Sequence, residues 1–169
     1  MDYENIKEFL LKGENIFLTG PGGVGKSYYI NKLKEDSDLD HLNITVTSTT
    51  GISSFNIKGQ TIHSFSGIGV CQDGDTENSI LKRMKKFKIF EKTSEKVQKC
   101  DILVIDEVSM LGMKFLDILN KILKSLRQNT KIMGGIQIIF TGDFLQLPPI
   151  NDDFCFKSEV WKSLKLNIV

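Results

Sequence analysis

Near its N-terminus the chain reads Gly20-Pro21-Gly22-Gly23-Val24-Gly25-Lys26-Ser27, which fits the pattern G-x-x-x-x-G-K-[ST] of a phosphate-binding loop. Residues 15–19 before it have the apolar pattern of a buried strand, and residues 26–35 after it have that of a helix. A surface glycine turn is the alternative, but it does not require this order of strand, loop and helix. We therefore expect the backbone N–H groups of residues 20–27 to surround phosphate oxygens, with Lys26 reaching the outer phosphates and Ser27 ligating Mg²⁺.

A second motif follows the apolar run Ile102-Leu103-Val104-Ile105, which is typical of a strand buried on both faces of a parallel sheet. The run continues directly into two acids, Asp106 and Glu107. Asp106 is placed to hold the magnesium hydration shell, and Glu107 to orient and deprotonate an attacking water. An acidic strand end can also be a solvated cap, but its combination with the phosphate loop favours a site for ATP and Mg²⁺.

Composition points to one ordinary globular domain. The chain has 169 residues, of which 40% are hydrophobic and 25% charged, and its formal net charge is +1. This charge gives no overall attraction for nucleic acid, so any such binding must come from a local patch. Cys71, Cys100 and Cys155 lack the spacing of a zinc site and are expected to be reduced thiols of an intracellular protein. No leader peptide or membrane span is predicted.

Strands and helices are predicted to alternate along the chain. The predicted strands cover residues 15–20, 43–48, 101–106, 136–142 and 164–169, and the clearest amphipathic helix runs from Met113 to Arg127. This order predicts a three-layer α/β fold with a mostly parallel, doubly wound sheet, whose functional loops lie at the carboxyl ends of the strands. Residues 67–80, which are rich in Gly and Asp, are expected to form a small exposed excursion.

Further segments carry a resemblance to a known family. Residues 47–54 (Thr-Ser-Thr-Thr-Gly-Ile-Ser-Ser) and 59–69 (Gly-Gln-Thr-Ile-His-Ser-Phe-Ser-Gly-Ile-Gly) resemble motif Ia of the petite integration frequency helicases. Residues 142–149 (Gly-Asp-Phe-Leu-Gln-Leu-Pro-Pro) resemble their motif III, and residues 154–161 resemble the segment that follows it. These enzymes are superfamily 1B DNA helicases that move 5′ to 3′.

The resemblance implies that residues 1–169 are the first, N-terminal RecA-like domain of a P-loop NTPase motor. It implies ATP and Mg²⁺ as cofactors, single-stranded DNA and duplex junctions as partners, and roles in DNA repair, recombination and telomere maintenance. It also implies a monomeric, intracellular protein. Carried over to this chain, Lys26, Asp106 and Glu107 serve catalysis, Ser27 and Asp106 hold the metal, and Gln146 senses the γ-phosphate.

The same resemblance suggests which residues face DNA. The candidates are short hydroxyls and a glycine that suit close approach of a phosphate backbone, together with one imidazole: Thr49, Thr50, Gly51, Thr61, His63 and Ser64. His63 and Phe65 carry rings on which a base could stack, although His63 could equally be structural and Phe65 could belong to the core. The basic cluster at residues 82–88 could touch phosphates or form a solvated helix face.

The chain departs from the family in length. It ends before the second RecA-like domain, which should supply arginines to the nucleotide, so the chain alone is expected to bind nucleotide but not to unwind DNA. Two rival functions stay open at this point. One is another nucleic-acid-dependent ATPase of the clamp-loader kind, which would lack the segment at residues 142–149. The other is a non-enzymatic, nucleotide-gated DNA-binding module.

Overall fold

A six-stranded parallel sheet forms the centre of the molecule in this computed structural model, which describes residues 2–169. The strand order is β3-β2-β4-β5-β1-β6, and every pairing is parallel. The strands are β1 (Ile16–Thr19), β2 (Ile44–Ser48), β3 (Gln60–Thr61), β4 (Ile102–Asp106), β5 (Gln137–Gly142) and β6 (Asn167–Ile168). The α/β class and the parallel sheet predicted from the sequence are confirmed.

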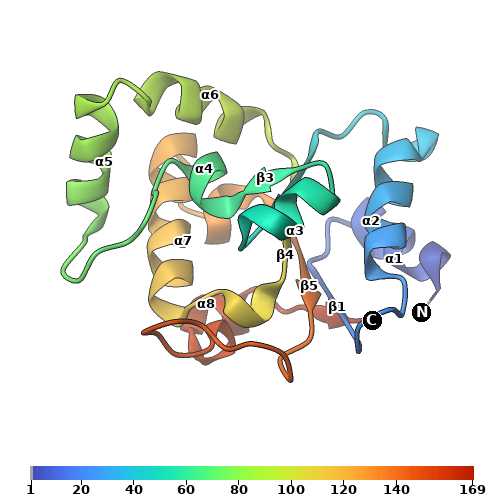
Figure 1. The fold of residues 1–169 in the computed structure, drawn as a ribbon. Coiled ribbons are helices and arrows are strands. Elements are labelled where there is room, and N and C mark those ends of the chain that lie inside the picture. The colour runs from blue at the N-terminus through green and yellow to red at the C-terminus, as the bar shows by residue number, and fades with distance from the viewer. Residues whose placement is uncertain (1) are drawn as a thin grey trace.

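Helices cover both faces of the sheet and make the fold three-layered (Figure 1). The α-helices are α1 (Tyr3–Leu11), α2 (Lys26–Glu35), α3 (Gly51–Asn56), α4 (Ile62–Ser66), α5 (Glu77–Lys86), α6 (Phe90–Lys99), α7 (Met113–Arg127) and α8 (Glu159–Ser163). Short 3-10 turns lie at Ser37–Leu39, Val108–Met110, Ile132–Gly135 and Cys155–Lys157. In Figure 1, α1 and α2 lie to the right of the sheet and α4 to α7 to its left.

Alternate residues of the strands enter two separate cores, as the period of two requires. On β4, Leu103 and Ile105 join the core beneath α4 to α7, whereas Val104 joins the core beneath α1 and α2. Helices cover both faces of β4, and all five of its residues are buried, the acid Asp106 among them. The sheet is therefore held rigidly from both sides, which fixes the positions of the loops at its edges.

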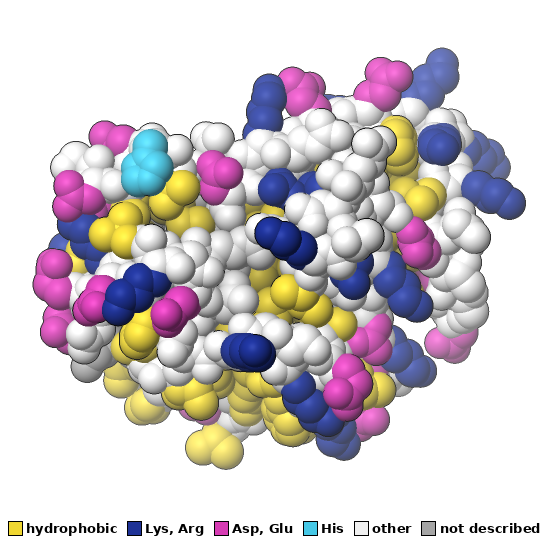
Figure 2. All heavy atoms as spheres, turned by 180° about the vertical axis from the view of Figure 1, so that it is seen from behind, with side chains coloured by type: hydrophobic (Ala, Val, Ile, Leu, Met, Phe, Trp, Pro, Cys, Tyr) yellow, Lys and Arg dark blue, Asp and Glu magenta, His cyan; other side chains and the backbone are white. Residues whose placement is uncertain are grey.

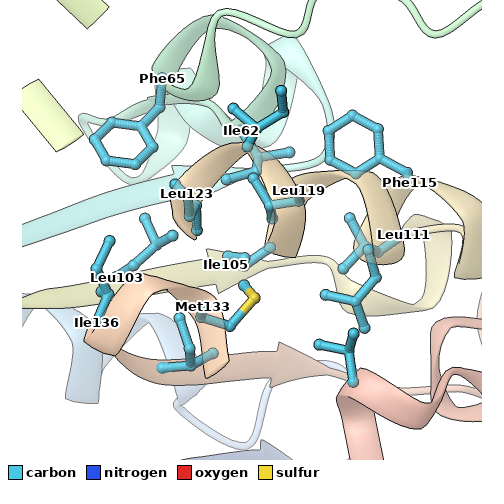
Figure 3. Close-up of a cluster of buried hydrophobic side chains, with 14 of the residues drawn as sticks. Ile62, Phe65, Leu103, Ile105, Leu111, Phe115, Leu119, Leu123, Met133 and Ile136 are labelled. Carbon is cyan, nitrogen blue, oxygen red and sulfur yellow. The ribbon is translucent and has the colours of Figure 1, made fainter. Parts of the chain in front are cut away.

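The predicted helix at residues 113–127 is α7, with the same first and last residues. Its buried stripe includes Leu119 and Leu123, which lie towards Leu103 and Ile105 of β4, and Phe115, which lies on the side of α4 near Ile62 (Figure 3). Phe65 of α4 is part of the same cluster and is 1% exposed. The hypothesis that the Phe65 ring stacks on a base is therefore wrong, and the alternative that it belongs to the core is confirmed.

Strand β3 was not predicted from the sequence. It has two residues and pairs with the end of β2, with Thr47 opposite Gln60 and Ser48 opposite Thr61. The preceding residue, Gly59, has no room for a side chain, because a Cβ there would lie 2.4 Å from the Val46 carbonyl oxygen. This close approach involves Val46, which is distant from Gly59 in sequence, so no local sequence pattern predicts the strand.

The segment expected to be an exposed excursion, residues 67–80, divides into two parts. Residues 67–76 form a loop, and α5 begins at Glu77. Thr76 and Ser79 cap this helix reciprocally, each side chain bonding to the backbone N–H of the other. Ile68 is 1% exposed and anchors the loop in the core. Among residues 2–169 there is no helix whose length and hydrophobicity would let it cross a lipid bilayer.

Candidate active site

The loop of residues 20–27 connects β1 to α2 at the carboxyl edge of the sheet. Gly20, Gly23 and Gly25 have φ angles of 147°, 83° and 94°, which side chains rarely tolerate. These glycines therefore allow the loop to make its tight turn between β1 and the start of α2 at Lys26. The Lys26 ammonium donates to the carbonyl oxygens of Gly20, at 2.5 Å, and Pro21, at 3.0 Å, and so lies across the loop.

The acidic pair lies at the end of β4. Asp106 is 7% exposed, and its carboxylate accepts a hydrogen bond from the hydroxyl of Thr141 on β5. Glu107 is half-buried and has a left-handed backbone, with φ 59° and ψ 45°. Burial and the neighbouring Asp106 charge raise the pKa of Glu107, and the Lys26 charge opposes this rise. The positive charge of the phosphate-loop lysine thus acts on the Glu107 carboxyl group.

Strand β5 separates β4 from β1 and joins the two motifs. Its last residue, Gly142, pairs with Thr19 immediately before the loop of residues 20–27. Gly142 also packs against the acidic turn, since a Cβ there would lie 2.9 Å from the Val108 nitrogen. With a φ of 146°, this residue suits glycine in conformation as well as in size. Gly142 at the end of β5 therefore contacts both the strand that leads into the phosphate loop and the turn that follows Glu107.

Gln146 follows in the loop after β5. Its Nε2 atom is 4.0 Å from the position that a Cβ on Gly22 would occupy, so its amide lies beside the phosphate loop. Asp143 holds this segment: its carboxylate accepts from the Leu145 N–H at 2.9 Å, and its carbonyl accepts from the Gln146 N–H at 3.0 Å. The structure thus brings Gln146 to the same edge as Lys26 and Glu107.

The residues at this edge fit a magnesium-bound nucleoside triphosphate. Glycines without Cβ atoms leave the loop backbone open, and Lys26 adds a positive charge to it. The hydroxyl of exposed Ser27 and the Asp106 carboxylate are oxygen donors of the kind that Mg²⁺ prefers. The residues of the two sequence motifs therefore lie at the same edge of the sheet.

The candidate DNA-binding residues lie around α3 and α4, on the neighbouring part of the same sheet edge. Thr50 and Thr61 are helix caps: their hydroxyl oxygens accept from the N–H groups of Ser53, at 3.2 Å, and Ser64, at 3.1 Å. Each hydroxyl keeps its own proton for another acceptor. Gly51 is exposed and has open space where a Cβ would lie. Caps at both helices therefore fix two hydroxyls near the surface.

His63 is half-buried, and its ring centroid lies 4.5 Å from that of Phe115 on α7. Burial lowers the pKa of His63, which favours the uncharged imidazole at neutral pH. One side of the ring thus rests on the core, while His63 also lines a groove with Thr49, Val70 and Lys114. Ser64 is exposed, and its carbonyl accepts from the Lys96 ammonium at 3.5 Å.

The basic cluster of residues 82–88 lies on α5 and the turn after it. Arg83 is paired with Asp75 at 3.0 Å. The Lys85 and Lys86 ammonium groups lie over the rings of Phe90 and Phe87, at 4.9 and 5.7 Å from the ring centroids. In the rear view of Figure 2, Lys and Arg side chains gather towards the side that carries α5 and α6. These contacts fit the interpretation of the cluster as a solvated helix face.

Comparison with known proteins identifies relatives along the whole chain. A family model described as PIF1-like helicase matches residues 3–168. The ATP-dependent DNA helicase Pif1 of Psychrobacter sp. (strain PRwf-1) is 39% identical over 161 residues, which are 91% of this chain and 24% of that relative. The chain thus spans about a quarter of the length of this relative.

Solved structures match the fold as well. The crystal structure of Pif1 helicase from Candida albicans has a TM-score of 0.88 and 34% identity, and the match covers 99% of this chain and 38% of that one. A Bacteroides Pif1 helicase crystallised with ADP-AlF3 and single-stranded DNA has a TM-score of 0.79 and 27% identity, over 99% of this chain and 40% of that one. The RecA-like fold expected from the resemblance is confirmed.

Thr141 was not among the residues singled out from the sequence, and its contact with Asp106 generates a prediction. Thr141→Val should lower the free energy of unfolding by about 1–3 kcal/mol, because it leaves a buried carboxylate oxygen without its donor. Urea denaturation followed by circular dichroism measures this change. Thr141→Ser keeps the hydroxyl and is the control, and equal losses for both variants would show that the hydrogen bond is unimportant.

Proposed function

This chain belongs to the PIF1-like helicase family, and from that premise we propose that it is the ATP-binding first motor domain of a 5′-to-3′ DNA helicase. The protein would translocate on single-stranded DNA and open duplex junctions. The observation that carries this proposal is the meeting of the phosphate loop, the acidic pair and Gln146 at one edge of the sheet, beside the α3 and α4 segments. Work in DNA repair, recombination and telomere maintenance would follow from the family.

For hydrolysis, we propose a task for each residue. The amides of the loop and the Lys26 ammonium would hold the phosphates, while Ser27 and Asp106 would hold the metal. Bound Mg²⁺ would neutralise charge on the β- and γ-phosphates. Glu107 would accept a proton from the attacking water, and its raised pKa favours proton acceptance. The Gln146 amide would donate to the γ-phosphate or hold that water.

For DNA, the proposal uses the loops on either side of α3 and α4. Thr50, Gly51, Thr61 and Ser64 would approach phosphates, and the exposed side of His63 would stack on a base. A Bacteroides relative has been crystallised with both a nucleotide analogue and single-stranded DNA, which supports two ligands on one motor. Opening and closing of the cleft between two RecA-like domains would then move the grip along the strand.

Two substitutions test the nucleotide site in the intact protein that carries this chain. Lys26→Ala should weaken ATP binding about tenfold or more, because it removes a charged donor to phosphate. Glu107→Gln should retain ATP binding but slow hydrolysis by about 10²–10⁴, because the amide cannot accept the proton. Fluorescent-nucleotide titration and phosphate release measure the two steps, with exposed Lys121→Ala on α7 as control. Wild-type hydrolysis by Glu107→Gln would refute the assignment.

The 169-residue chain alone should bind nucleotide weakly, hydrolyse it slowly and leave duplex DNA intact. Arginines from a second RecA-like domain would be missing, and such arginines are worth roughly 10³–10⁵ in rate. A strand-displacement assay with a labelled fork, run beside the intact protein, measures this difference. Robust unwinding by the chain alone would contradict the two-domain mechanism.

His63→Ala should weaken binding of single-stranded DNA about tenfold, because loss of one base stack costs roughly 1–3 kcal/mol. The matched control is His41→Ala, which removes the other histidine of the chain from an exposed turn before β2. Fluorescence anisotropy with a labelled oligonucleotide measures both affinities. If the two variants bind DNA equally well, His63 has only its structural contact with Phe115.

A further inference from the structure

Thr49 binds the backbone of both acidic residues. Its N–H donates to the Asp106 carbonyl at 3.2 Å, and its hydroxyl donates to the Glu107 carbonyl at 3.0 Å. Strand β2 pairs with β4 as far as Ser48 opposite Asp106, so Thr49 extends this pairing beyond the last strand residues. The first bond is available to any residue except proline, but the second requires a hydroxyl at this position.

The backbone that Thr49 holds is unfavourable by itself. Glu107 has a φ of 59°, a conformation that costs energy for a residue with a side chain. Two positions later, Ser109 is 1% exposed, and its hydroxyl has no hydrogen-bond partner in the described part of the chain. A buried hydroxyl in this state is also costly. Such a turn persists only where its surroundings hold it.

Hydrogen bonds from inside and outside the turn hold the Glu107 main chain. Within the turn, the Met110 N–H donates to the Glu107 carbonyl at 3.1 Å. From outside the turn, the Thr49 hydroxyl donates to the same carbonyl, while Gly142 limits movement by packing on Val108. The Thr49 hydroxyl is therefore a specific restraint on the residue proposed to activate water.

Thr49 also contacts the region proposed to bind DNA. It lines one groove together with His63, and the next residue, Thr50, caps α3. A displacement of residues 49–51 by a bound strand would therefore act directly on the Glu107 carbonyl. Thr49 thus lies beside the proposed DNA-binding residues and contacts the main chain of Asp106 and Glu107, the acids proposed to serve hydrolysis.

We propose that Thr49 is a positioning residue whose hydroxyl sets the orientation of Glu107 and transmits strand binding to ATP hydrolysis. This inference rests on the function proposed above. It also revises the expectation that the Thr49 hydroxyl donates to a DNA phosphate. A hydroxyl has one proton, and that of Thr49 is already given to the Glu107 carbonyl.

The test compares three variants of the intact protein that carries this chain. Thr49→Val keeps the shape but removes the hydroxyl, and Thr49→Ser keeps the hydroxyl. Thr47→Val is the matched control, since Thr47 lies two residues earlier on β2 and its hydroxyl donates to the Val104 carbonyl of β4 at 2.7 Å. Steady-state hydrolysis at saturating single-stranded DNA, affinity for that DNA and affinity for ADP are measured for each.

Thr49→Val should lower the DNA-stimulated kcat about tenfold, the effect of losing one hydrogen bond, with both affinities within about twofold of wild type. Thr49→Ser and Thr47→Val should each have the kcat of the wild type. An unaltered kcat in Thr49→Val would overturn the proposal. So would weaker DNA binding with a normal kcat at saturation, which would make Thr49 a DNA contact. An equal loss of kcat in Thr47→Val would also overturn it, because the effect would then come from weaker pairing of β2 with β4 and not from the Thr49 hydroxyl.

Hydrogen exchange separates this inference from the proposed function. The Met110 and Leu111 N–H groups donate within the turn, to the carbonyls of Glu107 and Val108. Their exchange, followed by mass spectrometry without any ligand, should be about tenfold faster in Thr49→Val than in wild type, Thr49→Ser and Thr47→Val. Unchanged exchange refutes the restraint. If wild-type protein shows no DNA-stimulated hydrolysis, the proposed function fails, and this measurement still decides whether Thr49 holds Glu107.

Discussion

The candidate site depends on the insertion of β5 between β1 and β4 with all three strands parallel. This order brings two segments far apart in the sequence to one edge of the sheet. The last two residues of β5 make the connection: the Thr141 hydroxyl donates to Asp106, and Gly142 pairs with Thr19 and packs against Val108. A larger residue at position 142 would push the acidic turn away from the phosphate loop. The geometry of the site is therefore a consequence of sheet order.

Sequence patterns located the parts of the fold whose determinants are local. The strand periods, the glycines of residues 20–27 and the apolar stripe of α7 all lie within short windows, and α7 begins and ends where predicted. Strand β3 depends on the contact of Gly59 with Val46, and the role of Thr141 depends on its register beside Asp106. Neither contact has a local signature. Phe65 was ambiguous for the same reason, because only packing distinguishes a core ring from a surface ring.

Charge acts locally in this molecule. The net charge is +1, yet Lys26 influences the pKa of Glu107 and Arg83 is paired with Asp75. At short range in a partly buried site such interactions are weakly screened, whereas the exposed lysines of α5 are screened within about 10 Å at ordinary salt. Electrostatics thus acts on Glu107 within the site, whereas the net charge gives the domain as a whole little attraction for a polyanion.

The two outer strands, β3 and β6, each have only two residues. An edge strand exposes unpaired N–H and C=O groups that can recruit a strand from another molecule, and short edges offer few of them. The longer strands, β2, β4, β5 and β1, are enclosed between these two. The domain can thus keep a largely buried parallel sheet while presenting little template for amyloid-like association at the β3 margin.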